Sequence, residues 1–174
     1  MKQSNSASLY VTTYLWSILI GSIFYSHLVF YPAYLSNLPE STSLLNGPYP
    51  IDDRNYWMVL VPVILLSISV ALLMNWRYPV KRKYILYALI IYIAALLATA
   101  FYFVPELTAF SKSSFTDISR RSWRERGSTW LYLSWVRCAF MLIGFFMLLR
   151  AIRVSRHDDR KRRSRNNAPE NKQP

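Results

Sequence analysis

The alternation of apolar and charged positions divides the chain into four long hydrophobic blocks, at residues 9–31, 57–76, 84–104 and 130–150. The first three contain no Asp, Glu, Lys or Arg, and the fourth contains only Arg137 before Leu149. About 20 mainly apolar residues are the length a helix needs to cross the hydrocarbon core of a bilayer. The pattern predicts an all-α, integral membrane four-helix bundle over residues 9–152.

Residues 1–8 form a short polar N-terminus, and residues 153–174 form a basic tail that we expect to be disordered from Ser155 onward. The first block is too long for a cleaved signal peptide, whose apolar region spans about 7–15 residues, and no A-x-A-like site follows it. We therefore expect it to be a permanent membrane span.

Glycines and prolines predict where helices end, bend or approach each other. Pro105 is expected to end the third span, and Gly127 to break the chain before the fourth. Pro62 predicts a kink that faces the bundle. Gly21 predicts a close approach of a neighbouring helix, because it has no side chain.

Charge predicts the orientation. The net charge is +12, and 14 of the 21 Lys and Arg residues lie in the N-terminus, the 77–83 turn and the tail, against six in the other two loops. Basic loops stay on the cytoplasmic side, so both termini should be cytoplasmic in a multi-pass protein of the cell membrane. The eight basic residues at 150–165 predict contact with anionic lipid head groups rather than nucleic acid.

Arg137 is the most costly residue to place in a membrane. It follows Trp130 by seven residues, which is about 10 Å along a helix. Trp130, Ser134, Arg137, Met141 and Gly144 share one helical face, which we expect to look inward, because ionised groups at this depth face the bundle or a wet cavity. The alternative is that the side chain of Arg137 snorkels to the outer interface.

His27 is the only histidine inside an apolar block, since His157 lies in the tail. Antiparallel packing would bring it to nearly the depth of Arg137, with Glu106 close to both. An Arg137–Glu106 pair beside an imidazole would provide a base that titrates near neutral pH. The alternative is a histidine that is simply hydrogen-bonded at the interface.

Aromatic residues crowd the same level of the chain. Tyr31, Trp57 and Trp130, together with Ser134, are the candidates for binding a lipophilic substrate. The alternative is an aromatic belt at the membrane interface. A cavity that reaches His27 and Arg137 would favour ligand chemistry, whereas tight packing around them would favour a structural role.

No cofactor or metal site is predicted. The single cysteine, Cys138, cannot form an intramolecular disulfide, and His27 with Glu106 supplies at most two metal ligands. The phosphate-binding and nucleotide-binding glycine motifs and the zinc-protease motif are missing from the sequence. The oligomeric state is left open.

Four short motifs carry a resemblance to a known family. They are GSIFYSHLVFYP at 21–32, YWMVLVP at 56–62, Pro105, and WLYLSWVR at 130–137. Over residues 9–152 the chain resembles the anthrone-oxygenase-like family of small four-span membrane proteins, catalogued mostly as a domain of unknown function. The resemblance implies a four-helix membrane bundle, and some fungal members oxidise anthrones to anthraquinones with dioxygen and no apparent cofactor. The long first outer loop and the basic tail depart from the shorter members.

Two function hypotheses follow. In the first, the outer end of the bundle is a cofactor-free oxidoreductase site for a lipophilic aromatic, in which His27 removes a proton, Arg137 stabilises the oxyanion and Glu106 holds Arg137. In the second, a non-enzymatic bundle binds a lipid or a membrane-protein partner, and the charges are structural. A transporter is a weaker third hypothesis, because four spans without inverted repeats leave little room for alternating access.

Overall fold

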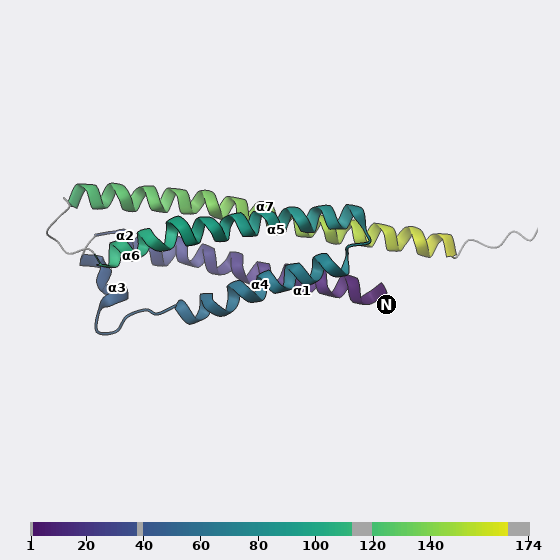
Figure 1. Ribbon diagram of the computed structural model, residues 1–174, viewed down its shortest axis with the longest axis horizontal. Helices are drawn as coiled ribbons and strands as arrows, with labels where there is room; N and C mark the ends of the chain where they lie inside the picture. Colours follow the sequence, from purple (N-terminus) through teal and green to yellow (C-terminus); the bar gives the residue numbers. More distant parts are fainter. Residues whose placement is uncertain (1, 38–39, 113–119, 167–174) are drawn as a thin grey trace, which may run out of the picture.

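The computed structural model describes residues 2–37, 40–112 and 120–166, and these residues are helical with no strand (Figure 1). Each of the four long helices runs antiparallel to the next along the chain, and short helical turns lie in the loop between the first two (Figure 1). The elements are α1 (Lys2–Tyr25), η1 (Ser26–Phe30), α2 (Tyr31–Leu35), η2 (Glu40–Thr42), α3 (Ser43–Asn46), α4 (Arg54–Met74), α5 (Pro79–Ala98), η3 (Thr99–Phe103), α6 (Val104–Lys112) and α7 (Arg120–Asn166).

Four of these helical stretches are long and apolar enough to cross a membrane, which confirms the predicted number of candidate spans. They cover Ser6–Leu35, Arg54–Met74, Pro79–Ser111 and Arg121–Val154. Large apolar side chains cover the outside of the bundle, and Leu28 and Leu66 are 65% and 67% exposed. A helix that is apolar on all faces is expected where its surroundings are hydrocarbon.

Two π-helical segments interrupt these helices, and each ends two residues before a proline. In η1 the Tyr31 N–H donates to Ser26 O, and in η3 the Val104 N–H donates to Thr99 O. A proline has no N–H, and its ring clashes with the carbonyl four residues earlier, so the preceding turn widens. Pro32 and Pro105 therefore widen the helices without ending them.

The predicted ends of the third and fourth spans are wrong. The third helix passes through Pro105 and continues as α6 to Lys112. Gly127 does not break the chain, because α7 is already helical at Arg120. The expected loop between these spans thus contains the extended ends of both helices, and residues 113–119 between them lie outside the described residues.

The centre of the bundle is packed around Trp16, which is fully buried. Its Nε1–H donates to Met141 O at 3.2 Å, and its ring lies 5.3 Å from the ring of Tyr92. Gly144 makes this packing possible, because a Cβ at that position would lie 2.8 Å from Cζ2 of Trp16. Helices in membranes approach closely where such small residues lie.

Two of the smaller predictions about this packing are wrong. A Cβ at Gly21 would meet nothing within 4 Å, so Gly21 mediates no close helix approach. Pro62 is exposed on the outer surface of α4 and does not face the bundle.

A second apolar cluster lies at the end of the bundle opposite the N-terminus, beyond the packing of Trp16. Its buried members are Tyr34, Phe103, Phe110, Trp123 and Trp130. The cluster joins α2, η3 and α6 to the first turns of α7. These contacts hold the ends of α2, α6 and α7 together at that end of the bundle.

The first residues of α1 and the last residues of α7 lie at the same end of the bundle (Figure 1). The 75–79 turn, which joins α4 to α5, lies there as well. Helix α7 extends to Asn166, so helix occupies part of the tail in which disorder was expected. The remaining tail residues, 167–174, lie outside the described residues.

Candidate functional site

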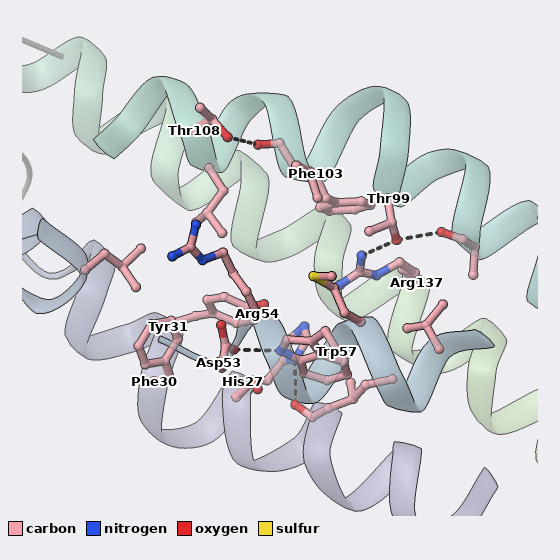
Figure 2. Close-up of a pocket in the computed structure, with 18 of the residues that line it drawn as sticks. His27, Phe30, Tyr31, Asp53, Arg54, Trp57, Thr99, Phe103, Thr108 and Arg137 are labelled. Atoms are coloured by element: carbon pink, nitrogen blue, oxygen red, sulfur yellow. Dashed lines mark hydrogen bonds between the residues drawn. The ribbon is translucent and has the colours of Figure 1, made fainter. Parts of the chain in front are cut away.

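A cavity of about 740 Å³ lies at the end of the bundle opposite the N-terminus, between η1, α4, η3 and α7. Cavities of about 300–1,000 Å³ are the usual size for small-molecule sites. Both His27 and Arg137 contribute to its wall, and so do Tyr31, Trp57 and Trp130 (Figure 2). The structure therefore brings together most of the site residues that the sequence predicted.

Arg137 reaches inward from α7, as predicted, and does not snorkel away from the bundle. Its Nη1–H donates to Thr99 Oγ1 at 2.7 Å (Figure 2), and its Nη2–H donates to Ser134 Oγ at 3.1 Å. The guanidinium carbon lies 4.1 Å from the centre of the Phe103 ring. Two of its three contacts thus come from η3, where the widened turn presents Thr99 and Phe103 toward α7.

Both ring nitrogens of His27 are hydrogen-bonded inside the protein. Nδ1 lies 2.7 Å from Ile23 O, and Nε2 lies 2.8 Å from Ser134 Oγ. A carbonyl oxygen can only accept, so we assign the proton to Nδ1. Ser134 then accepts from Arg137 and donates its single hydroxyl hydrogen to Nε2. A directed chain results, from Arg137 through Ser134 to His27.

Ser134 has a different role from the predicted substrate contact. Its side chain is fully buried, and its hydroxyl links Arg137 to His27 rather than forming part of the cavity wall. Because Ser134 occupies Nε2 of His27, a direct proton transfer from a ligand to His27 would require Ser134 to relay the proton or to turn away.

Glu106 does not hold Arg137, and that prediction is wrong. Its carboxylate receives two hydrogen bonds from Arg126 Nη2, at 2.8 and 3.0 Å, and Arg126 also lies 5.1 Å from the Trp123 ring. Because the third span continues past Pro105, Glu106 is carried beyond the level of Arg137. Within the described residues, Arg137 forms no ion pair.

The aromatic walls are held in fixed orientations. The ring of Tyr31 lies 4.6 Å from Trp130 and 5.3 Å from His27, edge to face in both cases. Trp130 donates its Nε1–H to Phe103 O at 3.1 Å, which ties α7 to η3. These rings line the cavity next to the guanidinium of Arg137.

The mouth of the cavity is polar. The Asp53 carboxylate accepts a hydrogen bond from Trp57 Nε1 at 2.6 Å (Figure 2), and Asp52 forms an ion pair with Arg54 at 2.7 Å. Hydrogen bonds from the side chain and the backbone N–H of Arg54 lower the pKa of Asp52 to about 2. Asp52 and Arg54 are therefore both charged at neutral pH, and together they add no net charge.

Sequence reasoning missed Thr99 and Phe103, the two residues of η3 that contact Arg137. Their position in the turn before Pro105 could have indicated them, because a proline inside an apolar helix widens the preceding turn. Asp53 was also missed, although it lies four residues before Trp57, within reach on a helical turn.

The donor set of this site suits an anionic oxygen rather than a metal ion. Within the part of the chain that the structure describes, no group of three His, Cys, Asp or Glu side chains lies close enough to hold a metal. Arg137 uses two of its five N–H groups on Thr99 and Ser134, which leaves three donors.

Comparisons with protein-family models, curated proteins and solved structures found no match to this chain. The resemblance to the anthrone-oxygenase-like family therefore stays a prediction.

Proposed function

We propose that this chain is a multi-pass protein of the cell membrane, with both termini cytoplasmic, whose outer cavity binds a lipophilic aromatic molecule through an acidic oxygen. The observation that carries the proposal is Arg137, a cation on the cavity wall whose hydrogen-bond partners are two neutral hydroxyls. A buried charge without a counter-charge is costly, and an anionic ligand oxygen would lower that cost.

The surroundings of Arg137 favour a flat, mainly apolar ligand. Tyr31, Phe103 and Trp130 line the cavity beside it, and aromatic rings pack well against other aromatic rings. Among the described residues that line the cavity, the arginines are Arg54 and Arg137. Arg54 lies at the mouth and is paired with Asp52, so Arg137 is the cation that a ligand would meet inside the cavity. A ligand with one acidic phenol or enol oxygen and an aromatic body matches this distribution.

A binding test follows from this geometry. The protein would be placed in lipid nanodiscs, and a hydroxylated anthraquinone would be titrated while the quenching of tryptophan fluorescence is followed. Arg137→Gln should raise the Kd about 10–100-fold, because a hydrogen bond to a charged group contributes about 1.5–3 kcal/mol. Arg137→Lys keeps the charge and should lose less. The matched control is Arg153→Gln, which changes an exposed arginine of the same helix. Equal binding by Arg137→Gln and unsubstituted protein would refute the proposal.

The second candidate function is cofactor-free oxidation of such a ligand, and the hydrogen-bond direction at His27 favours it. Because Nδ1–H is donated to Ile23 O, Nε2 holds a lone pair and can receive a proton once the Ser134 hydroxyl turns toward the cavity and relays it. Loss of a C–H proton from an anthrone would give an enolate whose oxyanion Arg137 stabilises. Dioxygen, the co-reactant, would add at that carbon to form a hydroperoxide after uptake of a proton. Loss of one water then leaves the anthraquinone.

Dioxygen uptake by nanodiscs supplied with an anthrone tests the oxidation. One O₂ should be consumed and one water released for each anthraquinone formed. Ser134→Ala should reduce turnover at least about tenfold while ligand affinity changes little, because relay of a proton is a catalytic effect of about 10²–10⁴. Tight binding without turnover would leave the non-enzymatic alternative, a bundle that binds a lipid, a lipophilic ligand or a membrane-protein partner.

A further inference from the structure

The cavity is open along one side, between α4 and the continuous helix formed by α5, η3 and α6. Met58 of α4 and Val104 of α6 both line the cavity, and they are 71% and 52% exposed. Such large exposed fractions are expected for lining side chains that form the edge of an opening. Figure 1 shows α4 diverging from α5 toward its Arg54 end, which is the end that bears the opening. We call this opening the lateral window, bounded by Met58 and Val104.

The edge of the opening changes from apolar to polar along the bundle axis. Met58 and Val104 are apolar and lie inside stretches that are long and apolar enough to cross a membrane, so we expect the lateral window to face acyl chains. A polar rim continues the opening at the Arg54 end of one stretch and the Ser111 end of the other, and it consists of Asp52, Arg54, Thr108 and Ser111. The two parts together match the interface of a bilayer, where hydrocarbon meets head groups within a few ångströms.

We propose that the ligand of this cavity passes into it sideways, from the membrane leaflet at that end of the bundle, through the lateral window. This inference rests on the proposed function, and it identifies the ligand as a membrane-dissolved aromatic phenol or enol. Such a molecule dissolves at the bilayer interface with its rings in the hydrocarbon and its hydroxyl near the head groups, as tyrosine and tryptophan side chains do. In that orientation its rings meet Met58 and Val104, and its hydroxyl meets the polar rim.

The path inside the window has the same apolar character down to Arg137. Behind the edge, the wall is formed by Val61, Ala95 and Leu96, and it ends at Thr99 and Arg137. A ligand that slides along this wall reaches the free N–H groups of Arg137 without first crossing water. An aqueous route would instead bring the apolar rings past the charged pair of Asp52 and Arg54.

Association kinetics test the window. A hydroxylated anthraquinone would be dissolved in liposomes that contain the protein, and binding would be followed by the fluorescence of the probe. Met58→Trp should slow association and dissociation about tenfold or more and leave the Kd within about twofold, because it narrows the passage without touching the contacts at Arg137. Leu66→Trp is the matched control, since Leu66 is 67% exposed on the same helix and does not line the cavity. Unchanged rates in Met58→Trp, with slower rates in Ser111→Trp at the polar rim, would overturn the proposal in favour of an aqueous route.

A measurement without ligand separates this inference from the proposed function. A spin label at Ala95→Cys, in a Cys138→Ala protein, would report collisions with lipid-soluble oxygen and with a water-soluble nickel complex. The lateral window predicts strong relaxation by oxygen, weak relaxation by nickel, and less oxygen relaxation after Met58→Trp is added. Dominant nickel relaxation would overturn the window even if the probe binds. Oxygen relaxation together with no probe binding would refute the proposed function alone.

Discussion

The guanidinium of Arg137 and the hydroxyl of Thr99 lie 2.7 Å apart and connect α7 to the π-helical segment η3. Thr99 in turn donates its hydroxyl hydrogen to Ala95 O at 2.7 Å. The partner of the deepest charge in the bundle is therefore a neutral hydroxyl held in place by its own helix. The predictions below follow from this arrangement and from the packing around it.

Replacing Thr99 by Val keeps the shape of the side chain and removes the acceptor for Arg137. The free energy of unfolding should fall by about 1–3 kcal/mol, because a charged N–H then loses its partner. Unfolding in mixed micelles titrated with dodecyl sulfate, followed by circular dichroism, would measure this. Thr108→Val is the control, since Thr108 is exposed on the same continuous helix and bonds to Val104 O. Equal stability of both variants would contradict the assigned role of Thr99.

Replacing Ser134 by Ala should break the chain from Arg137 to His27. Both neighbours lose a partner in a buried place, so we expect a loss of about 1–3 kcal/mol in the free energy of unfolding. Ser128→Ala is a matched change on α7, at an exposed hydroxyl that bonds to Glu125 O. The same micelle titration would compare them, and a larger effect at Ser128 would speak against the network.

A double-mutant cycle can decide which arginine Glu106 contacts. Glu106→Gln combined with Arg126→Gln should show a coupling energy of about 0.2–1 kcal/mol, because the pair is partly exposed. Glu106→Gln combined with Arg137→Gln should be additive within about 0.5 kcal/mol. Unfolding free energies of the four proteins in each cycle supply both values. Coupling between Glu106 and Arg137 alone would restore the pair that the sequence suggested.

The two mid-membrane glycines should respond differently to the same change. Gly144→Ala places a Cβ 2.8 Å from Cζ2 of Trp16, whose ring is fixed by its bond to Met141 O, so stability should fall by about 1–3 kcal/mol. Gly21→Ala meets open space and should be neutral or stabilising by up to about 1 kcal/mol. Thermal unfolding in detergent would rank them, and the reverse order would contradict the packing around Trp16.

The proposed orientation can be tested by labelling in cells. In a Cys138→Ala protein, a membrane-impermeant maleimide added from outside should label Ser43→Cys and should label Ser164→Cys only after the membrane is opened. The reason is the asymmetry of basic residues, which keeps the termini and the 77–83 turn in the cytoplasm. Labelling of both positions from outside would refute the orientation.

Several features of the site followed from the sequence because depth in a membrane is set by position along a helix. The lengths of the four apolar blocks predicted four membrane-spanning helices. The seven residues from Trp130 to Arg137 predicted the depth of the charge, and antiparallel packing predicted that His27 would lie near it. The structure brings His27 and Arg137 to the two sides of one serine.

Helix ends and charge partners could not be predicted in the same way. A proline or glycine that would end a helix in water need not end one in a bundle, because neighbouring helices and widened turns satisfy the backbone. The third helix therefore continues through Pro105, and α7 begins before Gly127. These extensions changed which side chains could meet.

The sequence by itself determined how many candidate membrane-spanning helices there are, that His27 lies near Arg137, and that this one cation is buried among apolar residues. Only the tertiary structure decided the partners of that cation. Arg126 and Arg137 are 11 residues apart on α7, or about 16 Å at the helical rise, and the extension of the third helix places Glu106 at the level of Arg126. Arg137 consequently faces Thr99, Ser134 and a cavity of about 740 Å³. The physical reason is that pairing depends on the rotation and separation of neighbouring helices, and side-chain packing over the whole bundle sets both.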